Sequence, residues 1–220
     1  MSSKRILLVE GEADRGFFEA LSRRLAVQLE TVNIGTPKSV GKKDTKQGVL
    51  HALPTYVQQL ADGQIEHLAV VLDADSAASG GLGFAKTLAQ LTAVLTPLGF
   101  THDSTASPGL LFNHSNGLNP FGAWIMPNNA ADGMLEDWVK SCIAPAESAL
   151  LGHAQSSIAA IPGGPKFKPV HQTKAEVATW LAWQAKPDHG LHKVAEEAGL
   201  LDEAAQPFVD LCAWLKRIFP

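Results

Sequence analysis

The stretch RILLVEGEAD, residues 5–14, decides the fold that we expect for the rest of the chain. Its apolar run, residues 6–9, leads directly into a carboxylate, a glycine and a helical pattern. A short apolar run closed by a turn residue is typical of a buried parallel strand. Open α/β sheets bind ligands at the carboxyl ends of their strands, so we expect Glu10 at such a site. Gly11 would permit a tight turn, and Asp14, one helical turn on, would face the same cavity.

A second stretch, LAVVLDAD at residues 68–75, repeats this pattern of an apolar run that ends in acids. We expect Asp73 and Asp75 to project toward the same crevice above the sheet. Carboxylates gathered this closely repel one another unless they are protonated or bridged by a cation. Mg²⁺ suits such a site because it takes hard oxygen ligands, typically one or two carboxylates with water and substrate phosphate. As ordinary acids at strand ends or helix starts, the same residues would have only structural roles.

Size and composition are those of a globular protein. The chain has 220 residues, of which 45% are hydrophobic and 18% charged, and its net charge of −4 provides no global basic field for nucleic acid. Cys142 and Cys212 form no C-x-x-C motif, which favours a reducing compartment over a structural zinc site. No apolar run reaches the length of about 18 residues that a membrane span needs. The first predicted strand leaves no room for a signal peptide, so we expect a cytoplasmic protein.

The order of predicted elements indicates an α/β protein with a mostly parallel sheet and helices on both faces. Strands are expected at 4–9, 31–34 and 68–72, with a hairpin-like pair at one edge formed by 110–112 and 122–126. Helices are expected at 12–29, 45–60, 84–95, 132–143, 145–160, 174–185, 190–199 and 204–218. We therefore predict a sheet domain over residues 1–144 and a helical appendage over 145–220, packed on the same domain.

The first two stretches together resemble the TOPRIM fold of topoisomerases, primases and overcoming-lysogenization-defect (OLD) nucleases. In that family a glutamate after the first strand and a D-x-D motif after the third bind Mg²⁺. Residues 9–14, VEGEAD, match its V-E-G-x-x-D form, and residues 73–75 match D-x-D. The resemblance covers about residues 4–140 and implies a Rossmann-like TOPRIM core. It also implies that Glu10, Asp73 and Asp75, with help from Asp14, hold the metal.

A third stretch, DGMLED at residues 132–137, looks like the acidic segment with which OLD-type nucleases bind a second metal. Asp132 and Glu136 share a helical face and are our candidates, whereas Asp137 points about 100° away from Glu136. These enzymes also use a late lysine, for which Lys174 is our candidate and Lys166 the alternative.

The segment at residues 35–46 is rich in lysine. Lys38, Lys42, Lys43 and Lys46 could contact the backbone of a nucleic acid, at a gain of about one released counterion per phosphate. The competing interpretation is a solvated loop with no ligand.

The resemblance implies a Mg²⁺-dependent phosphoryl-transfer enzyme, most simply a nuclease acting on DNA or RNA, with Mn²⁺ as a substitute ion. In such an enzyme two ions about 4 Å apart stabilise the attacking and leaving oxygens. Lys174 would neutralise charge on the scissile phosphate, and Glu10 could instead act as a general acid or base. The alternative is a non-catalytic module that binds a metal or nucleotide and acts with a partner protein such as an ATPase. A homodimer fits either reading. A phosphatase of the haloacid-dehalogenase kind ranks last, because two strands precede Asp73.

Overall fold

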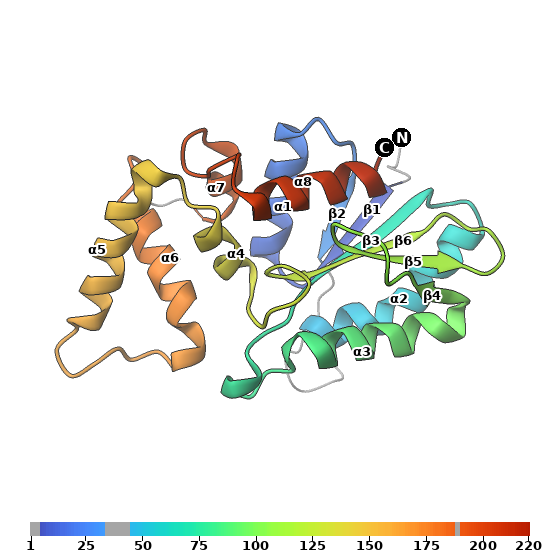
Figure 1. Cartoon of the computed structure of the whole chain (residues 1–220), viewed down its shortest axis with the longest axis horizontal. Helices are drawn as coiled ribbons and strands as arrows, with labels where there is room; N and C mark the ends of the chain where they lie inside the picture. The colour runs from blue at the N-terminus through green and yellow to red at the C-terminus, as the bar shows by residue number, and fades with distance from the viewer. Residues whose placement is uncertain (1–4, 34–44, 188–189) are drawn as a thin grey trace.

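The computed structural model describes residues 5–33, 45–187 and 190–220, and its central element is a six-stranded sheet (Figure 1). The strands are β1 (Arg5–Val9), β2 (Glu30–Asn33), β3 (His67–Asp73), β4 (Phe100–His102), β5 (Leu110–His114) and β6 (Phe121–Met126). They lie in the order β2-β1-β3-β6-β5-β4. The pairs β2–β1, β1–β3 and β3–β6 are parallel, whereas β6–β5 and β5–β4 are antiparallel. The expected α/β class with a mostly parallel sheet is confirmed.

The antiparallel half of the sheet differs in part from the expectation. β5 and β6 do form an antiparallel pair, but β6 also pairs with β3 and lies inside the sheet. Every residue of β6 is buried, as expected for a strand covered on both faces. The edge is formed by β4, whose three residues after the left-handed Gly99 are too short to give a periodic signal.

Helices cover both faces of the sheet. They are α1 (Glu12–Arg24), α2 (Thr45–Ala61), α3 (Gly83–Leu95), α4 (Leu135–Ser141), α5 (Ser148–Ala159), α6 (Gln172–Ala182), α7 (His192–Glu196) and α8 (Gln206–Ile218). Figure 1 shows α2 and α3 on one face and α1 and α8 on the other. α1 ends earlier than expected, because the chain turns at Ala26, which has a left-handed φ of 54°.

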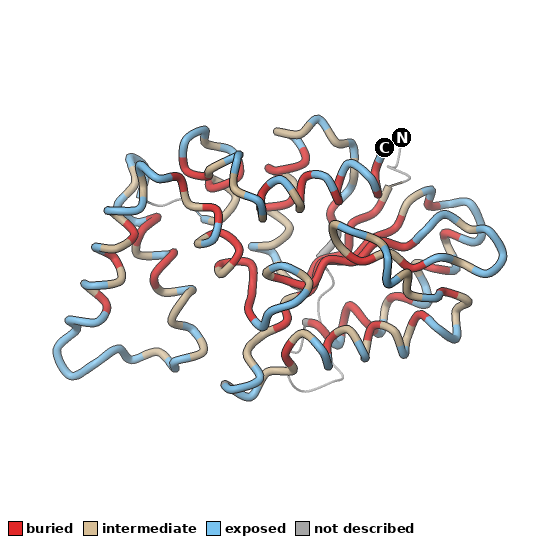
Figure 2. Tube along the Cα trace, viewed as in Figure 1, coloured by how far each residue is buried: buried red, intermediate tan, exposed pale blue. Residues whose placement is uncertain are grey.

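Alternating side chains of the central strands divide the core in two. The buried residues lie along these strands and on the helices that cover them (Figure 2). Leu7 and Val71 belong to the cluster that contains α1 and α8, whereas Leu8 and Val70 belong to the cluster beneath α2 and α3. This is the period of two that a strand imposes, here with both faces apolar. Burial of apolar surface, at about 25 cal/mol per Å², therefore acts from both sides to hold β1 and β3 in register.

The C-terminal third has two separate roles. α7 and α8 contribute to the same apolar cluster as α1, and a Cβ added at Gly122 of β6 would lie only 2.7 Å from the Ile218 side chain of α8. α5 and α6 form an antiparallel hairpin that projects from the body, on the side toward which β1 and β3 run (Figure 1). Their buried residues, such as Leu151 and Trp180, belong to the same apolar cluster. Within the described residues, no helix is both long and apolar enough to span a membrane.

Candidate metal centre

Glu10 and Asp73 meet at the carboxyl ends of two neighbouring parallel strands. Glu10 follows β1, and Asp73 is the last residue of β3, which pairs directly with β1. The backbone N–H of Asp73 donates a hydrogen bond of 2.9 Å to Oε1 of Glu10. Two acids that are far apart in sequence thus lie side by side, as the two sequence stretches predict.

Asp14 joins them from the first turn of α1 because Gly11 leaves it room. A Cβ at Gly11 would lie 3.1 Å from Oδ2 of Asp14. Gly11 has φ −142° and ψ 173°, an extended conformation open to any residue. The chain does turn into α1 here, but without a left-handed residue, so what Gly11 contributes is its missing side chain, which leaves room for the Asp14 carboxylate.

Helix α4 contributes Glu136 from a position over the end of β3. Oδ1 of Asp73 accepts a hydrogen bond of 3.0 Å from the backbone N–H of Leu135, the first residue of α4. The helix begins later than expected because Gly133 has φ +149° and Met134 is extended. Glu136, in the first turn, is buried, with only 8% of its surface exposed. Asp137 faces elsewhere, as expected, and its Oδ2 accepts the backbone N–H of Met134 at 2.9 Å.

Glu10, Asp14 and Asp73 hold their protons more tightly than usual, with raised pKa values. Burial raises the pKa of Glu10 to about 7, although the charge of Lys46 and the hydrogen bond from the Asp73 amide act to lower it. Burial, followed by the charge of Glu136, raises the pKa of Asp14 to about 6. The pKa of Asp73 is raised well above its usual value, first by burial and then by the Asp14, Glu10 and Glu136 carboxylates. The four acids are close enough to repel one another, and we call Glu10, Asp14, Asp73 and Glu136 the acid cluster.

Two lysines border the acid cluster. Nζ of Lys174, in the first turn of α6, lies 3.5 Å from Oε1 of Glu136. Burial lowers the pKa of Lys174, but the carboxylates of Glu136, Asp73 and Asp14 outweigh it and raise the pKa above its usual value. Of the two candidates for the late lysine, Lys174 is therefore the one placed at the acid cluster, whereas Lys166 is exposed in the connection between α5 and α6.

The second lysine, Lys46, differs from the solvent-facing residue that the sequence suggests. It is 4% exposed, and its Nζ forms a 2.6 Å ion pair with Oδ2 of Asp75. Asp75 has a left-handed φ of 59° and is tied to Gly133 through its backbone N–H. Lys46 thus supports the acidic loop after β3 instead of lying open to a nucleic-acid backbone. Lys38, Lys42 and Lys43 fall outside the described residues.

Asp132 lies apart from the acid cluster. It is exposed, and its two carboxylate oxygens accept backbone N–H groups, Oδ2 from Ala77 at 3.0 Å and Oδ1 from Phe84 at 2.8 Å. These hydrogen bonds lower the pKa of Asp132. Its observed role is to join the loop after β3 to the segment before α4, which gives no support to the expected pairing of Asp132 with Glu136 at a second metal.

The acid cluster fits a divalent cation by its chemistry. Oε2 of Glu136 is buried and accepts no hydrogen bond from any described residue. A buried carboxylate oxygen without a donor costs free energy, which a cation or a proton would offset. Within residues 5–33, 45–187 and 190–220, no three His, Cys, Asp or Glu side chains already stand as a complete ligand set. Amide and lysine donors hold the carboxylates instead, so binding would require these side chains to turn.

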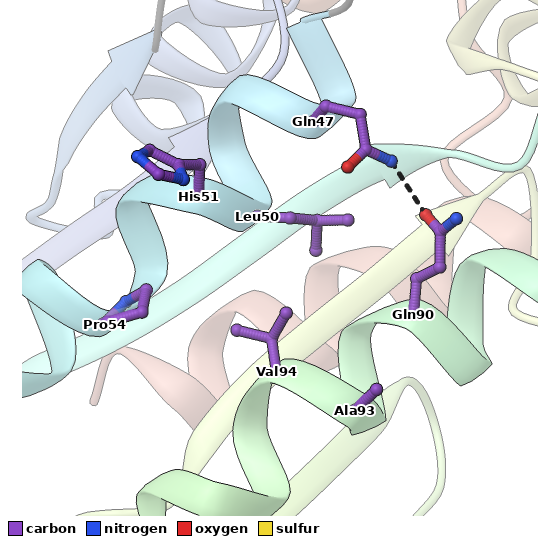
Figure 3. Close-up of a pocket in the computed structure, with 7 residues that line it drawn as sticks. All are labelled: Gln47, Leu50, His51, Pro54, Gln90, Ala93 and Val94. Carbon is purple, nitrogen blue, oxygen red and sulfur yellow. Dashed lines mark hydrogen bonds between the residues drawn. The ribbon is translucent and has the colours of Figure 1, made fainter.

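A separate groove lies between α2 and α3 (Figure 3). It has a volume of about 650 Å³ and is lined by Gln47, Leu50, His51, Pro54, Gln90, Ala93 and Val94. The side-chain amides of Gln47 and Gln90 bridge one end of it through a 3.0 Å hydrogen bond. Among the described residues, no carboxylate, lysine or arginine lines the groove, so its chemistry differs from that of the acid cluster.

Comparison with known proteins gives a family but no activity. A family model described as "Protein of unknown function (DUF3226)" matches residues 4–220. The chain belongs to the DUF3226 family. Neither the curated proteins nor the solved structures contain a match to it. The geometry of the acid cluster is therefore the observation from which a function has to be argued.

Proposed function

We propose that this DUF3226 protein is a metal-dependent phosphodiester hydrolase, a nuclease whose cation is held by the acid cluster. The observation that carries the proposal is the convergence of four carboxylates from β1, α1, β3 and α4 beside Lys174. A structural role would satisfy each acid with its own donors, as it does for Asp132. Raised pKa values and an unpartnered oxygen at one sheet edge instead favour a ligand site.

Glu10, Asp73 and Glu136 would hold the cation, with Asp14 assisting from α1. When bound, Mg²⁺ or Mn²⁺ polarises a phosphoryl oxygen and lowers the pKa of its water. Asp75, whose carboxylate is paired with Lys46, would act from the rim of the site. We leave Asp132 out of the ligand set because its oxygens already accept two backbone amides.

The remaining groups have roles that follow from their own chemistry. Lys174 carries a positive charge at neutral pH and would stabilise the charge that develops on a phosphoryl group beside Glu136. Glu10, with a pKa of about 7, can take or give a proton near neutral pH. Its Oε1 accepts the Asp73 amide, which positions the carboxyl group beside the end of β3.

The proposal is tested by cleavage of DNA, RNA and a small chromogenic phosphodiester with Mg²⁺ or Mn²⁺. We expect the wild-type chain to cleave at least one of them, and Asp73→Asn and Glu10→Gln each to lose a factor of about 10² to 10³, typical of removing a key electrostatic group. Asp62→Asn, an exposed acid at the end of α2, is the charge-matched control and should keep the wild-type rate. Equal cleavage by wild type, Asp73→Asn and Glu10→Gln would refute the proposal.

A further inference from the structure

The hairpin of α5 and α6, with its connection, forms a projecting arm, here defined as residues 148–182 (Figure 1). Its charge is unlike that of the rest of the chain. Of 220 residues 22 are acidic, yet none is acidic between Glu147 and Glu176. The same stretch holds Lys166, Lys168 and Lys174. The arm thus carries three lysines against the single carboxylate of Glu176, so an element of an acidic protein has a net positive charge.

The connection between the two helices carries the exposed part of this charge. Lys166 and Lys168 are both exposed and flank Phe167, which is partly buried. Neither lysine forms an ion pair with any residue in the described part of the chain. The 3₁₀ turn η5 (Pro169–His171) and the first turn of α6 then lead directly to Lys174. The three lysines follow one another from the far end of the arm to the acid cluster.

Polar contacts fix the N-terminal half of α6 to α4 near Lys174. Oγ1 of Thr173 donates to Oδ1 of Asp137 at 2.8 Å, just before Lys174. Two residues after Lys174, Oε2 of the buried Glu176 accepts hydrogen bonds from Nζ of Lys140 in α4 at 2.5 Å and from Nε2 of Gln155 in α5 at 3.1 Å. Because α4 also carries Glu136, these contacts set the position of the arm relative to the acid cluster. The arm is therefore not a loosely attached hairpin.

We propose that the arm is the surface that binds the phosphate backbone of a polynucleotide and leads it to the acid cluster. Successive exposed lysines on one path match a repeating anion, and an aromatic ring between them offers a face on which a base can stack. Mutual repulsion would keep a polyanion away from the carboxylates themselves, so a basic arm beside them supplies the missing attraction. The inference rests on the proposed function for its substrate class, and extends it from a phosphodiester to a polymer.

Binding is measured by fluorescence anisotropy with the full chain, a labelled single-stranded oligonucleotide of about 20 nucleotides and EDTA, so that no cleavage occurs. The test variant is Lys166→Gln with Lys168→Gln. Its matched control is Lys86→Gln with Lys216→Gln, two exposed lysines of α3 and α8. At about 0.1 M salt we expect the arm variant to bind about tenfold or more weakly and its log–log salt slope to fall by about 1.5, while the control stays within about twofold.

Equal weakening of both variants, or wild-type binding by the arm variant, would overturn the inference. Thermal melts that match wild type show that each variant is folded. Competition by polyglutamate at the same charge concentration as the oligonucleotide would indicate an acidic protein as the partner and would also overturn it.

Cleavage assays separate failure of the arm from failure of the proposed function. We expect the arm variant to cleave the small phosphodiester at the wild-type rate but the polynucleotide about tenfold more slowly, because only the polymer reaches the arm. If wild type binds the oligonucleotide through the arm and cleaves neither substrate, the proposed function fails and the arm inference stands. If the arm variant cleaves the polynucleotide as wild type does, the arm inference fails alone.

Discussion

Glu136 and Asp137 are neighbours on α4, but their carboxylates have opposite surroundings. Asp137 accepts hydrogen bonds from the Met134 backbone and the Thr173 hydroxyl, whereas Glu136 is buried among like charges with one oxygen unpartnered. The same division holds more widely: Asp132 and Glu176 have lowered pKa values, and Glu10 and Asp14 have raised ones. Donors dominate around the acids with lowered pKa values, whereas burial and mutual repulsion dominate in the acid cluster.

The sharpest test of this contrast is cleavage by the two α4 variants. Glu136→Gln should lower the rate of phosphodiester cleavage by a factor of about 10² to 10³, because it removes a charge from the acid cluster. Asp137→Asn, which keeps an acceptor for the Met134 amide, should lower it less than about tenfold. A larger loss in Asp137→Asn than in Glu136→Gln would reverse the assignment of the two residues.

Structural acids and acids of the acid cluster should also differ in their effect on stability, where the structural acids should matter more. Glu176→Ala leaves the Lys140 ammonium and two amide groups without their acceptor and should lower the free energy of unfolding by about 2–4 kcal/mol. Glu136→Gln relieves repulsion and should leave the stability of the metal-free protein unchanged or raised. Urea denaturation measures both. Equal destabilisation by the two substitutions would mean that Glu136 is a structural acid too.

The pH dependence of stability separates the two kinds of acid without mutation. The folded-state pKa of Glu10 is raised from 4.5 to about 7, so the folded protein binds its proton more tightly than the unfolded chain does. Stability from this group is complete below 4.5 and is lost as the pH rises through about 7. Without divalent cation we expect a loss on the order of 2 kcal/mol over this window, at about 1.4 kcal/mol per pKa unit with allowance for partial exposure.

Urea denaturation at a series of pH values measures this slope of the free energy of unfolding against pH. Glu10→Gln should flatten it, Asp62→Asn should leave it unchanged, and Mg²⁺ should reduce it by occupying the ionised cluster. A wild-type stability that rises between pH 5 and 7 would contradict the predicted direction of the Glu10 shift.

The smallest expected effect is at Gly11. Its φ of −142° admits alanine, so Gly11→Ala should change the free energy of unfolding by less than about 1 kcal/mol. The added Cβ would press on the Asp14 carboxylate, and Mn²⁺ affinity should fall about twofold to fivefold. Calorimetric titration with Mn²⁺ measures the second effect. Gly152→Ala, where an added Cβ meets nothing within 4 Å, is the matched control. Equal Mn²⁺ affinities in the two variants would show that Asp14 takes no part in binding.

The part of the site that the sequence could predict is the part built on strands. Apolar runs that end in acid place Glu10 and Asp73 by local pattern alone, and the parallel order brings the strand ends together. Lys46 carried no such signal, since a lysine in a lysine-rich stretch is ordinarily solvated, and only tertiary packing buries it against Asp75. Asp132 and Glu136 share a face only if a helix contains both. Gly133 delays the helix, and that local change separates the two residues.

In the fold too, features set by local pattern were predictable and features set by tertiary contacts were not. Long periodic helices such as α2 and α8 were predictable from spacing, whereas the three-residue β4 and the interior position of β6 depend on contacts distant in sequence. The sequence predicts one helical appendage over 145–220, whereas in the structure α5 and α6 form a projecting hairpin and α8 covers the sheet, although buried residues of all three join the cluster around α1. That difference is set by where each apolar face finds a partner.

The central claim is that carboxylates from β1, β3 and α4 converge to hold a divalent cation. A crystal soaked in Mn²⁺ and measured near the manganese absorption edge tests it most directly. We predict an anomalous difference peak bounded by Glu10, Asp73 and Glu136, absent from crystals of Asp73→Asn soaked in the same way. A wild-type crystal without a peak there, or with manganese only at surface acids such as Asp62, would contradict the claim.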